Sequence, residues 1–276
     1  MSEWLIEKES DSLDIRHRIL NVVYEEQSEF QHIAVVDTVD FGRILVLDGV
    51  IQTTLRDEFI YHEMLAHVPL FTHRSPRRVL VIGGGDGGTV REALKHPEVE
   101  KVDLVEIDGR VIEVSRKYLP ELASAFDDPR VTVYVEDGAK FVARSAGQYD
   151  AILIDAPDPV GPAEAIFSDT FYADVRKALR PGGVMSAQTE SPFMQGDLVA
   201  AIYRRIGSAF ETQRLYLAQV PTYSLGLWSF TLATVDPELL DLPPRTSEHV
   251  TTRYYTPEIH KAAFAQPKFV QDLLAK

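Results

Sequence analysis

Apolar and polar positions divide the chain into two kinds of pattern. Between Ile19 and Thr54, short β-rich runs are separated by turn signals, among them VDFGR at residues 39–43. Runs of this kind joined by tight turns are typical of hairpins, and no helical crossover separates them. The sequence therefore predicts a small antiparallel N-terminal β domain, which we bound at residues 1–56.

From Val79 onward, short apolar runs alternate with segments of helical period. Such alternation predicts an α/β fold with a mainly parallel sheet and right-handed crossovers, assigned to residues 57–276. One helix is expected to end before Pro69, because proline interrupts helical hydrogen bonding. The last helix is expected to dock on the body. Strands are expected at 79–82, 101–105, 131–135, 150–154, 184–188, 211–219 and 227–234, and helices at 57–68, 89–96, 109–118, 138–144, 168–179, 196–209 and 257–274.

A glycine-rich turn follows the first strand of the second pattern. Gly83, Gly85 and Gly88 fit GxGxxG, which allows a tight turn and close backbone approach to a ligand. Glu106 ends the next strand, where an acid can accept hydrogen bonds from ribose hydroxyls, and Asp108 competes for that role. Together with the flanking strands, the motif predicts a nucleotide or nucleoside pocket.

Asp86 lies inside this loop and narrows the choice of ligand. A dinucleotide would place its pyrophosphate at the helix N-terminus, and a carboxylate there would repel it. A sulfonium nucleoside such as S-adenosylmethionine, or its decarboxylated relative, is favoured on charge grounds. The alternative is that Asp86 only caps the helix.

Acidic residues follow four of the predicted parallel strands. They are Asp86, Glu106, Asp137 with Gly138, and the pair Asp155 and Asp158. Because ligands bind beyond the carboxyl ends of such strands, the acids predict a pocket for hydroxyls, amino groups and positive charge. Asp137 fits a helix cap equally well. The proline-rich stretch 155–167 is interpreted as a lid, or alternatively as a rigid connection.

Two further groups of residues invite a functional interpretation. His62, Glu63 and His67 form HExxxH, one residue longer than the zinc motif HExxH, so no metal is expected. His62 is then either a packed polar residue or a substrate contact. Tyr223 and Trp228 flank a turn, where their rings could hold an alkylammonium group or simply pack in the core.

Composition excludes several classes of function. The chain has 276 residues, no cysteine and a formal charge of −14. This charge argues against nucleic acid or anionic lipid as partner and permits a cationic substrate, although acidity also serves solubility. With no cysteine, no apolar run of membrane-spanning length and no leader pattern, we expect a cytoplasmic protein. GxSxG and Walker A patterns are missing from the sequence, which disfavours hydrolase and P-loop chemistry.

Six segments, in order, carry a resemblance to a known family: LDGVIQTTLRDEFIYHEM, VLVIGGGDGGTVRE, LVEIDGRVI, DDPRV…VEDGAKF, DAPDPVGPAE and VPTYSLGLW. They closely resemble the spermidine synthase family of polyamine aminopropyltransferases. The similarity extends through RYYTPEIHKAAFAQPKFV near the C-terminus.

The resemblance implies transfer of an aminopropyl group from decarboxylated S-adenosylmethionine to a diamine such as putrescine, giving spermidine and methylthioadenosine. It implies a Rossmann-like, class I methyltransferase-type catalytic domain at 57–276 behind the N-terminal β domain. It also implies no metal, no cofactor beyond this co-substrate, and a homodimer or homotetramer. Polyamine and nucleoside substrates are expected as partners, with no nucleic acid and no membrane.

Matched position by position, the resemblance implies a role for each candidate residue. Asp155 is similar to the family's proton acceptor. The amine contacts are Asp86, Asp158, Tyr61, His62 and Tyr223, and the thioadenosine contacts are Gln31, Gln52, Gly83, Gly85, Glu106, Asp137, Gly138 and Pro162.

Three departures from the family pattern leave the acceptor open. Leu55 stands where an acid is usual, Ala156 and Pro157 replace two small hydroxyl residues, and Ser224 and Leu225 change the PTYPSG segment. Agmatine, cadaverine or a longer polyamine are therefore alternative acceptors. An S-adenosylmethionine-dependent methyltransferase and a non-catalytic nucleoside or polyamine-binding protein are the alternatives from other classes.

Overall fold

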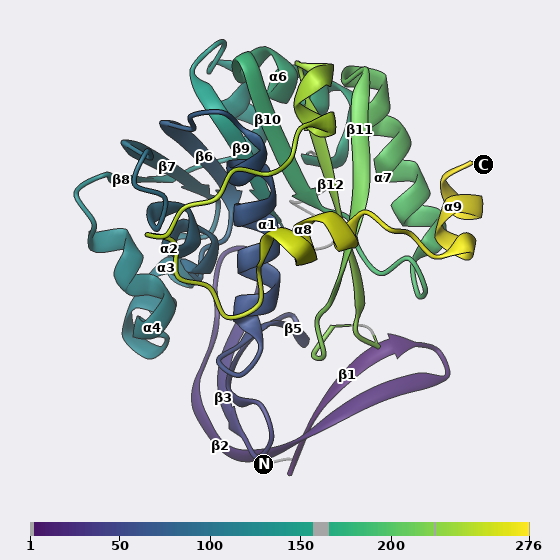
Figure 1. The fold of residues 1–276 in the computed structure, drawn as a ribbon. Helices are drawn as coiled ribbons and strands as arrows, with labels where there is room; N and C mark the ends of the chain where they lie inside the picture. Colours follow the sequence, from purple (N-terminus) through teal and green to yellow (C-terminus); the bar gives the residue numbers. More distant parts are fainter. Residues whose placement is uncertain (1–2, 157–165, 224, 276) are drawn as a thin grey trace.

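The computed structural model describes residues 3–156, 166–223 and 225–275. Their strands form two sheets (Figure 1). The first is a five-stranded antiparallel sheet in the order β1-β2-β3-β4-β5, which confirms the predicted N-terminal β structure. Its strands are β1 (Trp4–Ser10), β2 (Leu13–Gln27), β3 (His32–Thr38), β4 (Gly42–Leu47) and β5 (Val50–Thr54).

Strand β1 and the first half of β2 were missed in the sequence pattern. Figure 1 shows that these two strands form a hairpin projecting from the rest of the sheet. Most of their side chains are exposed or half-buried, and the strands therefore carry no continuous apolar run. A strand that buries neither face leaves only a weak signal in the sequence.

The second sheet has seven strands in the order β11-β12-β10-β9-β6-β7-β8. Strands β10, β9, β6, β7 and β8 are parallel, whereas β12 and β11 close one edge as an antiparallel hairpin. The mainly parallel, Rossmann-like sheet is thereby confirmed. Its strands are β6 (Arg78–Gly83), β7 (Lys101–Glu106), β8 (Val131–Val135), β9 (Tyr149–Asp155), β10 (Leu179–Gln188), β11 (Thr212–Gln219) and β12 (Leu227–Thr234).

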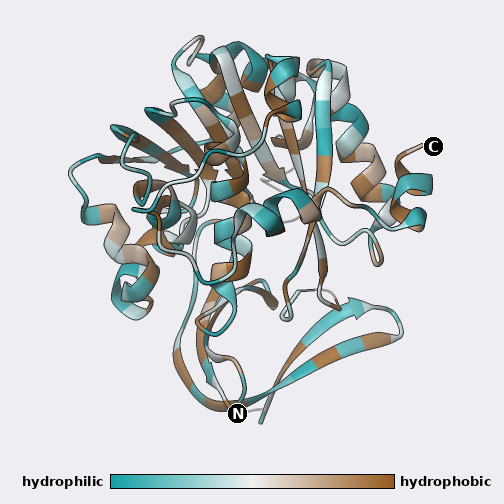
Figure 2. Cartoon of the chain, viewed as in Figure 1, coloured by the Kyte–Doolittle hydropathy of each residue, from teal (hydrophilic) through white to brown (hydrophobic). Residues whose placement is uncertain are grey.

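Alternate residues of the central strands bury side chains on opposite faces of this sheet. Val79 and Val81 of β6 belong to one core cluster, whereas Leu80 and Ile82 belong to the other. Helices cover both faces, and Figure 2 shows the resulting apolar interior. Each such side chain contributes roughly 1.5–3 kcal/mol when fully buried.

Helix α1 (Glu58–Thr72) continues beyond the predicted end at Pro69. The proline lies inside the helix and is buried, and its carbonyl accepts a hydrogen bond from the backbone N–H of His73. The prediction was wrong because α1 is buried along nearly its whole length, and this packing outweighs the cost of one interrupted hydrogen bond.

The helix expected at 257–274 is two helices, α8 (Pro257–Ala263) and α9 (Lys268–Leu274). Pro267 occupies the N-cap of α9 with extended backbone geometry and separates the two. The expected docking is confirmed, because Val270 and Leu273 pack against Val199 and Leu215. The remaining helices of the described chain are α2 (Gly88–Leu94), α3 (Gly109–Tyr118), α4 (Pro120–Ala123), α5 (Gly138–Ala143), α6 (Asp169–Ala178) and α7 (Gly196–Ala209), with the short 3₁₀ turns Ser124–Asp127 and Pro237–Asp241.

Strand β6 lies between β7 and β9, so the chain reverses its direction across the sheet at this point. In parallel sheets the carboxyl ends of the two strands flanking such a reversal form the usual ligand crevice. Here Gly83 at the end of β6 pairs with Asp155 at the end of β9. Within the part of the chain that the structure describes, no helix is long and apolar enough to span a bilayer.

Candidate active site

Asp155 lies at this crevice and receives two hydroxyl donors from different helices. The Tyr61 phenol of α1 donates to Oδ1 at 2.7 Å, and the Thr89 hydroxyl of α2 donates to Oδ2 at 2.6 Å. Burial and the negative charge of Asp155 raise the pKa of Tyr61 well above its usual value, so the phenol keeps its proton. Each carboxylate oxygen of Asp155 is thereby held by one donor.

The glycine loop leaves room for this arrangement. Gly83 has a φ of +78°, and a Cβ there would lie 2.1 Å from the carbonyl oxygen of Asp155. Gly88 is the first residue of α2 and lets this helix pack close to α1, since a Cβ at Gly88 would lie 2.2 Å from the His62 ring. Gly85 borders Glu106, which a Cβ would approach to 3.0 Å. Side chains at these positions would clash with the Asp155 backbone, the His62 ring and the Glu106 side chain.

His62 is buried between two carboxylates. Its Nδ1 lies 2.6 Å from Oε2 of Glu58, and its Nε2 lies 3.4 Å from Oδ2 of Asp86. We call Glu58, His62 and Asp86 the rim cluster. Asp86 also accepts a hydrogen bond from the backbone N–H of Gly88 at 2.7 Å, so the predicted helix-start contact and an ionic contact occur together.

The rim cluster keeps its charges despite burial. Burial alone would lower the pKa of His62, but Asp86 and Glu58 outweigh it and raise that pKa well above the usual value. Burial opposes ionisation of Asp86, yet His62 and the Gly88 hydrogen bond lower its pKa. Asp155 behaves oppositely, because burial and the Asp86 charge raise its pKa more than His62, Thr89 and Tyr61 lower it. The crevice thus combines Asp86, which stays ionised, with Asp155, which binds a proton more readily.

Glu106 and Asp108, the two candidates for the ribose contact, have different neighbours in the structure. Asp108 caps α3 through the Arg110 N–H and accepts hydrogen bonds from Ser28 and from Gln31 Nε2, the latter at 3.0 Å. Glu106 accepts the Asp108 backbone N–H at 3.0 Å, and burial raises its pKa to about 7. Glu106 is therefore the acid at the strand end, and Gln31 reaches it by way of Asp108.

Aromatic side chains border the acids. The Tyr223 ring meets Tyr61 edge-on at 5.5 Å and Trp228 at 4.8 Å between centroids. Its hydroxyl donates to the backbone carbonyl of Gln52 in β5, which ties the first sheet to the β11–β12 turn. Trp228 is buried and its indole nitrogen has no hydrogen-bond partner within the described chain. Tyr223 thus borders the crevice through its contact with Tyr61, and Trp228 packs against the Tyr223 ring.

Asp137 acts as the N-cap of α5. Its Oδ1 accepts the backbone N–H groups of Ala139 at 2.8 Å and Lys140 at 3.3 Å, which matches the capping interpretation. Gly138 packs under Ile82, whose Cγ2 would lie 2.6 Å from an added Cβ. Both residues lie at the carboxyl end of β8, beside the Glu106 strand.

Several predicted positions fall outside the described residues. They are Asp158, Pro162, Pro157 and Ser224, together with most of the stretch 155–167 interpreted as a lid.

Three charged or polar neighbours of the site were missed in the sequence: Glu58, Thr89 and Arg91. Arg91 Nη2 donates to Glu58 at 2.7 Å, and its Nε donates to Glu92 at 2.9 Å. A signal existed for Glu58, which is four residues before His62 and so shares its helical face. None existed for the Thr89 contact with Asp155 or for the Arg91 contact with Glu58, because the partners in each contact are distant in the sequence.

The second histidine of HExxxH belongs to another group, which we call the distal cluster: His67, Glu92 and His96. His67 lies 2.9 Å from His96 and 3.0 Å from Glu92. Among residues 3–156, 166–223 and 225–275, no three acidic or histidine side chains are arranged to hold a metal ion.

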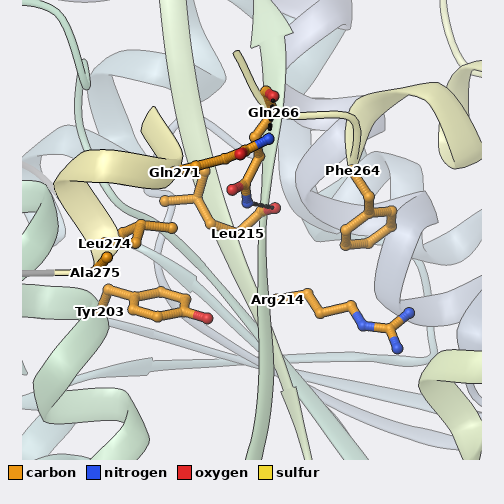
Figure 3. A pocket seen from close by; sticks show the side chains of 8 residues that line it. All are labelled: Tyr203, Arg214, Leu215, Phe264, Gln266, Gln271, Leu274 and Ala275. Carbon is orange, nitrogen blue, oxygen red and sulfur yellow. Dashed lines mark hydrogen bonds between the residues drawn. The ribbon is translucent and has the colours of Figure 1, made fainter. Parts of the chain in front are cut away.

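A hollow of about 410 Å³ lies elsewhere, between α7, β11 and the C-terminal helices (Figure 3). Gln266 Nε2 donates to the Leu215 carbonyl and Gln271 Nε2 to the Gln266 carbonyl. Arg214 is directed to the Leu240 carbonyl and to Asp241. None of the eight lining side chains is acidic, so this hollow lacks the chemistry of the crevice.

The arrangement at the crevice suits chemistry on an amine. An acid that stays ionised can bind an ammonium group, and a more basic carboxylate beside it can accept a proton. The aromatic faces of Tyr61 and Tyr223 can cover an alkylammonium chain. Glu106 and the glycine loop lie at the same edge of the sheet as Asp155, where ligands of such folds bind.

Comparison with known proteins agrees with this geometry. Residues 58–241 match the spermine/spermidine synthase domain, and residues 3–54 match the spermidine synthase tetramerisation domain. A polyamine aminopropyltransferase of Desulforudis audaxviator is 50% identical over 272 residues, covering 99% of both chains.

Two solved structures resemble the whole chain. One is a spermidine synthase in complex with the transition-state analogue AdoDATO, with a TM-score of 0.96, 41% identity and coverage of 99% of this chain and 94% of that one. The other is spermidine synthase from Thermotoga maritima, with a TM-score of 0.95, 40% identity and coverage of 100% and 95%.

Proposed function

The chain belongs to the spermine/spermidine synthase family and is an aminopropyltransferase, and from this premise we propose that its acceptor is putrescine. The reaction would join the aminopropyl group of decarboxylated S-adenosylmethionine to putrescine and give spermidine and methylthioadenosine. The observation that carries the proposal is that Asp86, which stays ionised, and Asp155, whose pKa is raised, are neighbours at the crevice between β6 and β9. The two similar solved structures are named spermidine synthase, which supports putrescine as acceptor.

The proton acceptor in this proposal is Asp155. An alkylamine with a pKa of about 10 is almost entirely protonated at neutral pH and cannot attack carbon. Asp155 takes one proton from the amine, whose freed lone pair forms the new N–C bond. The C–S bond breaks, its electron pair stays on sulfur, and the sulfonium becomes a neutral thioether. A buried carboxylate of raised pKa is matched to this task.

The rim cluster binds positive charge in this scheme. Asp86 receives an ammonium group, and His62 acts on it through Asp86, because both ring nitrogens already face carboxylates. Tyr61 and Tyr223 line the amine chain. Asp158 is proposed as a further amine contact on the resemblance alone, since it lies outside the described residues.

The donor is proposed to lie over the glycine loop and the strand ends next to it. Glu106 would accept hydrogen bonds from the ribose, with Gln31 steadying the turn through Asp108. The remaining proposed donor contacts, carried by the family resemblance, are Gln52, Gly83, Gly85, Asp137, Gly138 and Pro162.

We further propose that the two substrates suffice and that the protein works as a homotetramer. The match of residues 3–54 to a tetramerisation domain supports an oligomer of this kind. Light scattering of the purified protein would give the number of subunits. Full turnover after treatment with a chelator is the expected result for a metal-free reaction.

One product analysis tests the function. The purified protein is incubated with decarboxylated S-adenosylmethionine and, separately, putrescine, agmatine, cadaverine or spermidine, and the products are identified by mass spectrometry. The largest kcat/KM is expected with putrescine. A larger value for another amine overturns the acceptor, and failure to aminopropylate any amine overturns the function. Methylated products from ordinary S-adenosylmethionine would favour the methyltransferase alternative.

A further inference from the structure

Thr89 is a buried residue in the first turn of α2, directly after the glycine loop. Threonine within a helix often donates its hydroxyl hydrogen to a carbonyl of the preceding turn. Thr89 instead donates to Oδ2 of Asp155 at 2.6 Å, across to strand β9. A hydroxyl has a single hydrogen, so this contact commits the donor capacity of Thr89 to Asp155.

The two donors to Asp155 come from different helices and reach different oxygens. Tyr61 of α1 holds Oδ1, and Thr89 of α2 holds Oδ2. A carboxylate has about four lone-pair sites, so the described residues leave two of them open for a proton or a substrate. Two fixed donors prevent rotation about the terminal side-chain bond, which is otherwise a broad torsion. The open lone pairs then point in a constant direction.

We propose, building on the function proposed above, that Thr89 is a positioning residue for the base Asp155. Its hydroxyl fixes the plane of the carboxylate and favours its ionised form, so that the open lone pairs face the amine that gives up its proton. Tyr61 cannot replace this contact, because it is occupied at the other oxygen.

Every element packed around Asp155 contributes to its charge state. Burial and the negative charge of Asp86 raise its pKa, whereas His62, Thr89 and Tyr61 lower it. Removal of the Thr89 hydroxyl leaves all charges in place and removes one donor to the ionised form, so the pKa should rise further. Among the described residues, the titratable groups that face Asp155 are Tyr61 and His62 of α1, Asp86 of the glycine loop, Glu106 of β7 and Tyr223 of the β11–β12 turn.

The test is a pH profile of kcat for Thr89→Val and Thr89→Ser, with both substrates saturating. Valine keeps the branched shape without the hydroxyl, and serine keeps the hydroxyl without the methyl group. For Thr89→Val we expect the acidic limb of kcat to move upward by about one pH unit, with a plateau roughly tenfold lower, as loss of a hydrogen bond to a charged group predicts. KM for the donor should change less than about threefold. The acidic limb of the kcat profile of Thr89→Ser should lie at the same pH as that of the parent enzyme.

Thr89→Ala covers the case in which valine prevents folding, because alanine also lacks the hydroxyl and is smaller. A shifted limb in Thr89→Ala together with a normal limb in Thr89→Ser supports the proposal. An unshifted limb in both Thr89→Val and Thr89→Ala overturns it. Equal loss of activity in the valine, alanine and serine variants also overturns it, because packing and not the hydroxyl would then be responsible. Failure of the proposed function would appear separately, as a parent enzyme that aminopropylates no amine.

Discussion

Each of the two clusters holds a buried histidine whose pKa is shifted, and the two shifts have opposite directions. His62 of the rim cluster faces the carboxylates of Glu58 and Asp86 and holds a raised pKa. His96 of the distal cluster, which contacts His67 of α1, has its pKa lowered to about 2 by burial and by neighbouring positive charge. The same residue type is therefore cationic at the crevice and neutral in the core.

The difference arises from what surrounds each cluster. Arg91 contacts both, since it donates to Glu58 and to Glu92. In the distal cluster Lys95 also binds Glu92, at 2.6 Å, and contacts to His67, Arg91 and Lys95 lower the pKa of Glu92 to about 2 although burial opposes this. Phe71 packs on His96 at 4.6 Å between centroids. The distal cluster is closed by aromatic packing, whereas the rim cluster adjoins Asp155.

The largest effect on activity is expected for Asp155→Asn. This change removes the proposed proton acceptor and keeps the size of the side chain, so turnover should fall by about 10²–10⁴-fold. Release of methylthioadenosine measures it. Asp103→Asn is the matched control, because Asp103 is also a sheet carboxylate that accepts a tyrosine hydroxyl, from Tyr149 at 2.9 Å. Near-normal turnover of Asp155→Asn would remove this residue from the base role.

A matched pair, His62→Gln and His67→Gln, tests the contrast between the clusters directly. Each change breaks a buried contact between a histidine and a carboxylate and should lower the free energy of unfolding by about 2–4 kcal/mol. Only His62→Gln should also reduce kcat/KM for the amine, by roughly tenfold, because Asp86 loses the partner that keeps it ionised. Urea unfolding and steady-state kinetics at 25 °C give the two quantities. Equal kinetic effects of both substitutions would abolish the functional distinction.

His62 and His96 should contribute to the pH dependence of stability in opposite directions. His96 has a depressed pKa, so the unfolded chain binds its proton more readily, and stability from this group is lost as pH falls below about 6.5. Glu92 adds to the loss below about pH 4.5. The raised pKa of His62 gives stability that is complete below about pH 6.5 and is lost as pH rises through its folded-state value.

His96→Gln tests how much His96 contributes to the change of the free energy of unfolding with pH. Between pH 7 and pH 5 the parent protein should lose roughly 2 kcal/mol through His96, and the variant should lose correspondingly less. Urea unfolding at both pH values measures the difference. The same pH dependence in parent and variant would show that His96 is not the titrating group.

The smallest effect is expected for Lys95→Met. Lys95 is partly exposed where it binds Glu92, so its loss should cost under about 1 kcal/mol and leave turnover unchanged. Thermal unfolding and the methylthioadenosine assay measure these. A loss as large as that of His67→Gln would mean that Lys95, and not the histidine, neutralises Glu92.

How much of the fold could be predicted depended on burial. Strands β6 and β9 are apolar on both faces and stood out in the sequence, whereas β1 lies in a mostly polar hairpin and did not. The helix end predicted before Pro69 was wrong, because the expectation that proline ends a helix takes no account of the packing around α1. The break before α9 was overlooked although Pro267 marks it, since the apolar period continues across it.

The sequence by itself determined the glycine loop and the row of acids at one edge of a parallel sheet, because parallel strands end at the same edge. Only the tertiary structure shows how Asp155, the proposed base, is held by its neighbours. Tyr61 and Thr89 lie 94 and 66 positions from Asp155 in the chain, yet both hydroxyls reach its carboxylate. The charge of a buried group depends on distances of a few ångströms to all its neighbours, and those distances exist only once α1, α2 and β9 are packed together.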